Sequence, residues 1–171
     1  NHKTLRKILK KISFPLAIPS ANKSQGISPV KATDVAEEFE NNLKFILDGK
    51  ACKIGIESTV VDLTNKAKIL RPGAISSVKL SKILNCRVPI IKKFVNIRSP
   101  GQLKKHYSPG IPMILNQKKI IKNEEFIIFG KKYESTNFTY NLSVKSDLDE
   151  AARNLYKIFR KIKKKGFKKI Y

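Results

Sequence analysis

The strongest constraint on the fold is a break in the apolar pattern over residues 97–112. Ser99-Pro100-Gly101 and Ser108-Pro109-Gly110 bracket this stretch, which has little apolar periodicity. Pro and Gly clusters between periodic segments indicate a loop rather than a helix or a strand. The sequence therefore predicts two folded parts, residues 1–96 and 113–171, joined by a linker or an active-site loop.

The first part is predicted to mix helices with short strands. Apolar residues at helical spacing indicate helices, and β-branched runs indicate strands. Ser28-Pro29 suits a helix start, because Ser is a good N-cap and Pro fits the first helical position, and Asp48-Gly49 suits the end of the same helix. The predicted helices are Leu5–Ile12, residues 28–48 and Val78–Leu84, and the predicted strands are Phe14–Ile18, residues around Ile54 and Ile56, Thr59–Leu63 and Lys68–Arg71.

The second part is predicted to be a small parallel α/β unit. Short apolar strands are expected at Met113–Leu115, Phe126–Phe129 and Lys168–Tyr171, with an amphipathic helix at Leu148–Ile162. Strand, helix, strand order is typical of parallel pairing. The fold class predicted for the whole chain is α/β (α+β).

The charge leaves two interpretations open. The net charge is +23, which favours binding to nucleic-acid phosphates. Only six of the 36 basic residues are Arg, however, and a Lys-rich, Ile-rich chain is also typical of an AT-biased genome. No apolar run is long enough to cross a bilayer, so we expect a soluble, cytoplasmic protein. Cys52 and Cys86 lack metal-ligand spacing and are expected to be reduced and buried.

Four short motifs carry polar side chains at the ends of predicted strands or inside the linker. They are Pro19-Ser20-Ala21-Asn22, Gly55-Ile56-Glu57-Ser58-Thr59, Leu70-Arg71-Pro72-Gly73 and His106-Tyr107-Ser108-Pro109. Each alone has an ordinary structural explanation, such as a turn, a surface ion pair or a docked linker. Arg71 is also suited to a phosphate, and Tyr107 to a base or a phosphate.

Taken in order, and with Ser28-Pro29 included, these motifs resemble the YrdC-like threonylcarbamoyl-AMP synthases, in the longer form that has a second domain. The resemblance covers nearly the whole chain, because Asn1-His2 is similar to the end of an Arg-x-Pro-x-His segment. It implies the C-terminal part of a YrdC-like twisted-sheet domain over residues 1–96, a linker or active-site loop over 97–112, and the start of a small Rossmann-like domain over 113–171. The family's N-terminal Lys-x-Arg portion has no counterpart, so we expect a fragment.

The resemblance also implies site residues. Threonine contacts fall on His2, Ser20 and Ser58. Nucleotide contacts fall on Asn22, Arg71 and Tyr107, and on Val30, which stands where the family usually has Thr and offers only its backbone. No protein nucleophile and no metal-ligating side chain is implied.

The activity that the resemblance implies joins L-threonine, bicarbonate and ATP into threonylcarbamoyl-AMP, with release of pyrophosphate. Mg²⁺ is expected to bind with ATP. The partners expected are ATP, L-threonine, bicarbonate, tRNA or double-stranded RNA, and the proteins that later transfer the threonylcarbamoyl group to tRNA. The alternative functions are a basic RNA-binding module without catalysis and an inactive fragment of the same family.

Overall fold

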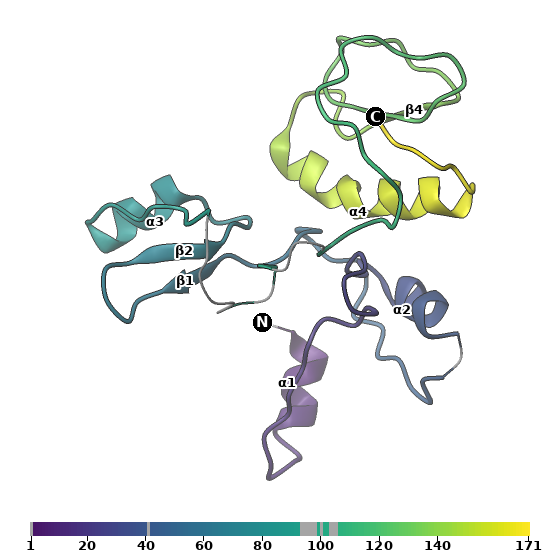
Figure 1. Cartoon of the computed structure of the whole chain (residues 1–171). Helices are drawn as coiled ribbons and strands as arrows, with labels where there is room; N and C mark the ends of the chain where they lie inside the picture. The colour runs from purple at the N-terminus through teal and green to yellow at the C-terminus, as the bar shows by residue number, and fades with distance from the viewer. Residues whose placement is uncertain (1, 41, 93–98, 100, 103–105) are drawn as a thin grey trace.

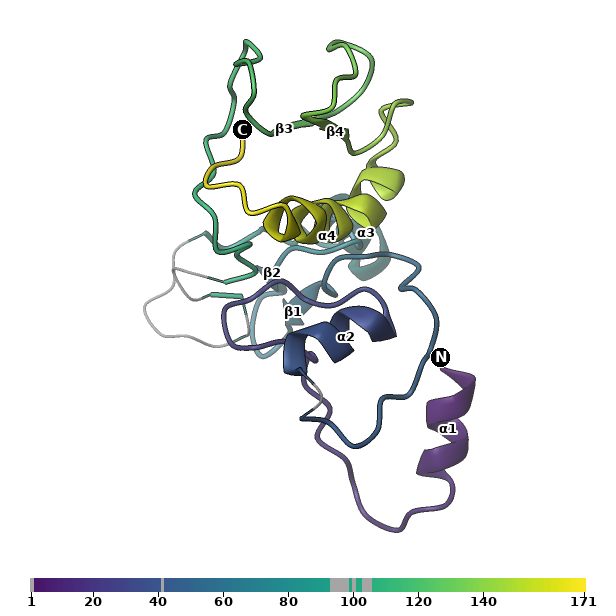
Figure 2. The same ribbon diagram turned by 90° about the vertical axis from the view of Figure 1, so that its right-hand side faces the viewer.

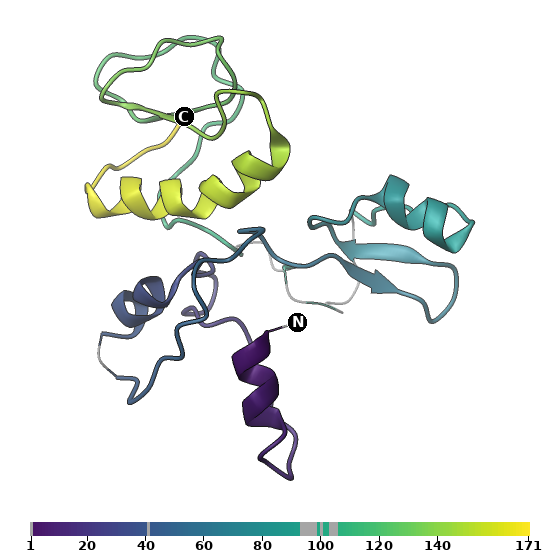
Figure 3. The same cartoon turned by 180° about the vertical axis from the view of Figure 1, so that it is seen from behind.

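The computed structural model describes residues 2–40, 42–92, 99, 101–102 and 106–171. Its helices and strands in chain order are α1 (Lys3–Leu9), α2 (Ala32–Phe39), β1 (Val60–Asp62), β2 (Lys68–Arg71), α3 (Ser77–Leu84), β3 (Phe126–Ile128), β4 (Thr139–Asn141) and α4 (Leu148–Lys164). Figures 1 and 3 show β1, β2 and α3 grouped on one side of the molecule and α4 with the C-terminal segments on the other. The predicted mixed α/β class is confirmed.

Strands β1 and β2 form an antiparallel hairpin that ends at Arg71. Val61 lies opposite Ile69, whose backbone also pairs with the segment that follows α3. The Ile69 N–H donates to the Pro89 carbonyl (2.8 Å), and the Ile91 N–H donates to the Ile69 carbonyl (3.0 Å). Ile69, two residues before Arg71, is therefore paired on both sides, and the register shifts between Val61 and Val60, which pairs with Arg71.

The C-terminal segments pair in parallel, as predicted, but Met113 and Ile170 form single bridges in place of the strands expected at Met113–Leu115 and Lys168–Tyr171. Strand β3 pairs with β4, so that Ile127 lies opposite Tyr140. Ile170 continues this arrangement through parallel bridges to Met113 and to Glu125. Four chain segments therefore lie side by side in parallel, and the more specific Rossmann-like description stays a prediction.

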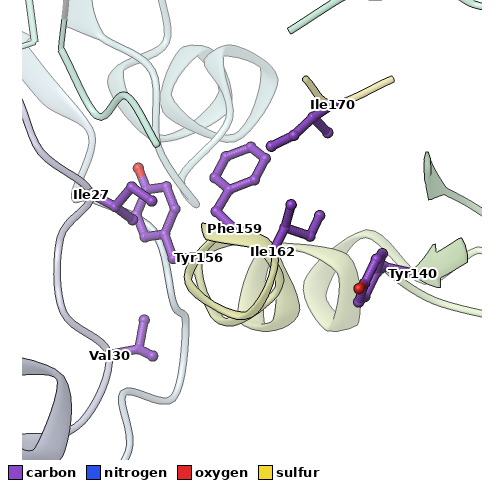
Figure 4. Packing of buried hydrophobic residues seen from close by; sticks show 7 residues of the cluster. All are labelled: Ile27, Val30, Tyr140, Tyr156, Phe159, Ile162 and Ile170. Carbon is purple, nitrogen blue, oxygen red and sulfur yellow. The ribbon is translucent and has the colours of Figure 1, made fainter. Parts of the chain in front are cut away.

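Helix α4 lies at the centre of the main hydrophobic core. Figure 2 shows α4 between the β3 and β4 segments and the part of the chain that contains α2. In Figure 4, Tyr156 leaves α4 on the side of Ile27, whereas Phe159 and Ile162 point toward Ile170. The buried members of the cluster are Ile27, Val30, Tyr140, Tyr156, Phe159, Ile162 and Ile170. One core therefore contains residues from both sides of the linker.

Polar contacts reinforce this packing. Arg160 of α4 donates to the Ile27 carbonyl (2.7 Å) and to the Glu38 carboxylate (3.2 Å). Lys164, one turn further along, donates to the Glu37 carboxylate (2.7 Å). The two predicted parts are thus attached through α4 and α2 as well as through residues 97–112.

The predicted strand at Phe14–Ile18 is wrong. These residues form no helix or strand, and the side chains of Phe14 and Ile18 are 59% and 61% exposed. A strand requires a neighbouring backbone to pair with, and the described part of the chain offers none here. The strand expected around Ile54 and Ile56 is likewise not formed.

The helix predicted over residues 28–48 is much shorter in the structure. Asp34 accepts hydrogen bonds from the backbone of Val30 (2.9 Å) and Lys31 (3.2 Å), which delays the helix start to Ala32. Glu40 adopts a left-handed conformation (φ 47°), and the helix ends at Phe39. Leu43 and Ile46, expected on its apolar face, lie beyond it.

Cys52 and Cys86 are both exposed thiols, so the expectation that they are buried was wrong. Among the described residues, no helix combines the length and the apolar character needed to cross a membrane.

Candidate functional site

Three of the residues predicted from the sequence meet around the guanidinium of Arg71. Its Nε donates to the Ser58 carbonyl (3.0 Å) and its Nη2 to the Ser58 hydroxyl (3.1 Å). Its Nη1 donates to the Tyr107 hydroxyl oxygen (2.7 Å). These three residues, which we call the Arg71 cluster, come from the end of β2, the segment before β1 and the linker.

The backbone next to Arg71 is shaped by a glycine. A Cβ atom on Gly73 would lie 2.5 Å from the Glu57 carbonyl oxygen and 2.5 Å from the Thr59 nitrogen, far inside contact distance. Only glycine lets the turn after β2 approach this segment so closely. The Pro72-Gly73 turn therefore holds Ser58 within reach of Arg71.

The linker reaches Arg71 through an unusual backbone conformation at Tyr107. Its φ of 53° lies in the left-handed region, which bulky side chains rarely adopt and which tends to occur at functional sites. The next residue anchors the linker, because the Ser108 N–H donates to the Gln25 carbonyl (3.0 Å). The His106 ring lies edge-on to Tyr107, with 3.9 Å between ring centroids.

Burial and a nearby carboxylate favour the protonated form of Tyr107. Burial raises the pKa of the Tyr107 phenol, Arg71 opposes this shift, and the negative charge of Glu57 adds to it. The phenol oxygen accepts a hydrogen bond from Arg71, so its own proton is available for a second partner. At neutral pH the Arg71 cluster thus offers one guanidinium and one phenolic donor.

Tyr156 is a neighbour of the cluster that sequence reasoning missed. Its hydroxyl donates to the Glu57 carboxylate (2.6 Å), across 99 residues of sequence. Its ring centroid lies 6.5 Å from that of Tyr107. Tyr156 stands on the apolar face of α4, where a buried aromatic residue is ordinary, and no sequence signal distinguishes it from a core residue.

Asn22 lies in a loop that touches the linker. Its side chain donates to the carbonyls of Lys23 (2.9 Å) and Gly26 (3.2 Å) and so stabilises its own loop. The contact between Ser108 and Gln25 joins this loop to the one that carries Tyr107. Ser20, two residues earlier, is exposed, and no contact within the described ranges links it to Arg71.

Val30 and His2 lie outside the Arg71 cluster. Val30 is buried, and its backbone is occupied, because its N–H donates to Asp34 and its carbonyl accepts from Cys52 (2.8 Å). His2 caps α1 by accepting from the Leu5 N–H (3.2 Å). The roles predicted for these two residues in ligand binding stay predictions.

The described residues contain no group of three or more His, Cys, Asp or Glu side chains suited to holding a metal ion. The chemistry that the Arg71 cluster supports is binding of a polar anionic ligand: a planar cation with fixed orientation, next to a phenol and a serine hydroxyl.

The fold and this site together define a mixed α/β protein whose linker tyrosine lies against an arginine of the first part. Two family models match the chain. The first, described as telomere recombination, covers residues 1–73, and the second, described as the C-terminal domain of threonylcarbamoyl-AMP synthase, covers residues 74–171. The chain belongs to the threonylcarbamoyl-AMP synthase family. These models meet at residues 73 and 74, ahead of the boundary predicted at residue 97.

Similar proteins carry the same name. The threonylcarbamoyl-AMP synthase of Pyrococcus abyssi is 32% identical over 96% of this chain and 54% of its own length. That of Schizosaccharomyces pombe is 36% identical over 59% of this chain and 27% of its own length, and that of Bacillus subtilis 31% identical over 67% and 34%. The chain thus spans about half of the Pyrococcus relative and less of the other two.

Solved structures show the same similarity. The crystal structure of Pyrococcus abyssi Sua5 complexed with L-threonine has a TM-score of 0.82 and 28% identity, and covers 99% of this chain and 55% of that chain. A doubly substituted variant of the same protein has a TM-score of 0.78 and 27% identity, with 99% and 54% covered. The fold of this chain is therefore that of the matching part of Sua5.

Proposed function

We propose that this chain provides part of the substrate site of an L-threonylcarbamoyladenylate synthase. The observation that carries the proposal is the Arg71 cluster, in which Ser58 and Tyr107 meet one guanidinium at 2.7–3.1 Å. Membership of the family supports it, as does the likeness to a structure that is complexed with L-threonine. In this proposal Ser58, Ser20 and His2 contact threonine, and Asn22, Arg71, Tyr107 and the Val30 backbone contact ATP.

In the proposed reaction the amino nitrogen of threonine attacks the carbon of bicarbonate, a C–O bond breaks, and water leaves, which gives the carbamate. A carbamate oxygen then attacks the α-phosphorus of ATP, the bond to the bridging oxygen breaks, and pyrophosphate leaves. Such a reaction needs positioning and charge stabilisation rather than a protein nucleophile. Arg71 uses three of its five N–H groups within the cluster, which leaves two for phosphate oxygens.

Tyr107 is proposed to cover the nucleotide. Its phenolic proton is available for a phosphate oxygen, and its position on the linker lets it exclude water from the labile carbamate and mixed anhydride. Mg²⁺ is proposed to bind with ATP, because the described residues lack a carboxylate cluster and Mg²⁺ commonly binds through substrate phosphates and water. When bound there, the ion would supply further positive charge beside Arg71.

The test is pyrophosphate release from ATP that depends on both threonine and bicarbonate. We expect Arg71→Lys to lower the rate about 10- to 100-fold, because lysine lacks the planar fork. Tyr107→Ala should weaken ATP binding and lower product yield while the fold stays intact. Tyr133→Phe is the matched control, since the Tyr133 hydroxyl bonds to Lys118 in a loop of the C-terminal part. Release that does not require bicarbonate would contradict the proposal.

The product is proposed to be used in the cytoplasm by proteins that transfer the threonylcarbamoyl group to tRNA. The net charge of +23 favours a second candidate, binding of tRNA or double-stranded RNA without catalysis. In that case the chain should bind an RNA duplex with an affinity that falls steeply with salt, and no pyrophosphate should be released. Binding of ATP and threonine without release would identify the chain as an inactive part of the enzyme.

A further inference from the structure

The contact between Tyr156 and Glu57 links α4 directly to the segment that carries Ser58. The Tyr156 hydroxyl donates to one carboxylate oxygen of Glu57 at 2.6 Å. Tyr156 is only 6% exposed and belongs to the central core, so its ring is fixed by packing against Ile27 and Phe159. A short hydrogen bond from a fixed phenol to a carboxylate holds the Glu57 side chain in one place.

Glu57 in turn is adjacent to the residue that orients Arg71. Ser58 accepts from Arg71 at both its carbonyl and its hydroxyl, so any shift of residues 57 and 58 moves two of the three anchors of the guanidinium. The Glu57 carbonyl lies against Gly73, which follows Arg71 by two residues. The Glu57 segment is therefore held between α4 on one side and the turn after β2 on the other.

Glu57 and Arg71 also interact electrostatically with the same tyrosine hydroxyls. Burial is the first cause that raises the pKa of the Tyr156 phenol well above its usual value, and the carboxylate of Glu57 adds to it. Glu57 raises the pKa of the Tyr107 phenol, and Arg71 lowers it. Glu57 thus partly balances the charge of Arg71 as well as accepting the bond from Tyr156.

We propose that Glu57 and Tyr156 are positioning residues for the Arg71 cluster, through which α4 controls the orientation of Arg71 and Tyr107. Tyr156 holds Glu57, Glu57 holds the Ser58 backbone, and Ser58 holds Arg71. The C-terminal part of the chain thereby acts on a site built mainly from the N-terminal part. What the cluster binds rests on the proposed function, but the orientation of Arg71 does not.

The other contacts of α4 provide a matched control. Lys164 lies on α4, two turns after Tyr156, and pairs with Glu37 of α2. The interactions described for Lys164 include none with the Arg71 cluster. Loss of this exposed ion pair loosens the attachment of α4 to α2 without changing the core, so it gives the baseline for a contact of α4 that does not reach Arg71. Positioning predicts that only the Tyr156 contact changes Arg71.

The first experiment follows the Arg71 Nε–H by ¹H–¹⁵N NMR in the chain as it is, with no ligand. The chain has only six arginines, so Arg71→Lys identifies the signal by its disappearance. We expect Tyr156→Phe, which keeps the ring, and Glu57→Ala to speed hydrogen exchange at Arg71 Nε about tenfold, because the bond to Ser58 opens more often. Lys164→Met should leave that rate unchanged. An unchanged rate in Tyr156→Phe, or an equal change in Lys164→Met, would overturn the inference.

A conservative variant separates positioning from folding. Glu57→Gln keeps a side-chain oxygen that accepts from Tyr156, so exchange at Arg71 Nε should return to within about twofold of the wild-type rate. If Glu57→Ala fails to fold, Glu57→Gln and Tyr156→Phe still decide the question. Exchange in Glu57→Gln that is as fast as in Tyr156→Phe would overturn the hydrogen-bonded link.

The second experiment measures the kinetic constants of pyrophosphate release. Tyr156→Phe should raise the KM for ATP about tenfold with a smaller change in kcat. The reason is that Arg71, the residue proposed to bind the phosphates, would already be misplaced when ATP binds. An unchanged KM for ATP would overturn the link to nucleotide binding. If the wild-type chain neither releases pyrophosphate nor binds ATP and threonine, the proposed function fails, whereas the exchange rate at Arg71 still decides the present inference.

Discussion

The backbone of Gly101 and the side chains of Arg71 and Tyr107 share one small volume. Gly101 has a φ of 92°, and a Cβ atom there would lie 3.0 Å from Arg71 Cδ and 3.2 Å from Tyr107 Cε2. The linker can therefore approach Arg71, because Gly101 has no side chain. Gly110, near the other end of the linker, has a φ of 76° but nothing within 4 Å of such an atom.

This pair gives a residue-scale prediction. Gly101→Ala and Gly110→Ala carry a similar backbone penalty of about 1 kcal/mol, because both positions are left-handed. Only Gly101→Ala should also displace Tyr107, which is measured as a shift of the Tyr107 ring signals in NMR spectra. If both variants shift these signals equally, crowding at Gly101 is not what sets the linker position.

We expect the carboxylate of Asp62, at the end of β1, to make the stability of the fold decrease at acid pH. A hydrogen bond from the Thr64 hydroxyl, then one from the Thr64 N–H, then Lys68 hold the pKa of Asp62 at about 2, below its ordinary 3.8. Because the folded pKa is the lower one, the stabilisation is complete above about pH 4 and is lost as the pH falls toward 2.

The measurement compares thermal unfolding of the wild type and Asp62→Asn between pH 5 and pH 2. The wild type should be the more stable protein at pH 5, and the difference between the two midpoints should shrink toward pH 2. A constant difference over this range would show that the carboxylate of Asp62 contributes no proton-linked stability.

At the scale of elements, α4 holds the two sides of the linker together. Phe159 is 6% exposed and belongs to the cluster that also contains Ile27, Val30 and Ile170. We expect Phe159→Ala to cost about 3–5 kcal/mol of unfolding free energy. The loss should appear in a single transition, because one core serves both sides of the linker.

Chemical denaturation followed by far-UV circular dichroism and by NMR signals on each side of the linker tests this. Leu148→Ala is the control on the same helix, since Leu148 is 76% exposed and should change the stability by less than about 0.5 kcal/mol. Two separate transitions, with only the C-terminal one moved by Phe159→Ala, would contradict a shared core.

The elements that sequence reasoning predicted well are those whose pattern is local. The observed bounds of β2 are the predicted ones, and α3 and α4 differ from prediction by one or two residues, because the residue types and the spacing that favour these elements lie within the elements themselves. Phe14–Ile18 has the composition of a strand but no paired neighbour among the residues that the structure describes, and its pattern carries no information about the partner. The helix after Ser28 was shortened by Asp34 and Glu40, whose local bonding and conformation override the apolar spacing.

The same distinction applies to the candidate site. Ser58, Arg71 and Tyr107 were found because ordered motifs marked them, and the structure brings them together. The pairing of Tyr156 with Glu57 joins residues 99 positions apart, and nothing in either local pattern specifies it. Contacts of this kind depend on how α4 packs, which only the folded chain determines.

At the scale of the whole molecule, the surface combines high charge with exposed apolar side chains. Phe45 is 91% exposed, and Leu115 and Leu63 are 73% and 62% exposed. Phe14 and Ile18 add to this surface at 59% and 61%. Exposed apolar side chains favour contact between copies, whereas a net charge of +23 keeps copies apart by repulsion.

These two effects predict that self-association of the isolated chain increases with salt. At low ionic strength repulsion between copies opposes contact, but at about 0.15 M salt charges more than about 8 Å apart are largely screened while apolar attraction remains. Light scattering after size exclusion should therefore show a monomer at low salt and larger species as salt is raised.

Replacing the exposed Phe14, Ile18 and Phe45 with Ser should remove most of the association, because these side chains contribute apolar area without belonging to the core. Association that weakens with salt, or a monomer at every salt concentration, would contradict this balance; the first result would instead indicate contacts between opposite charges.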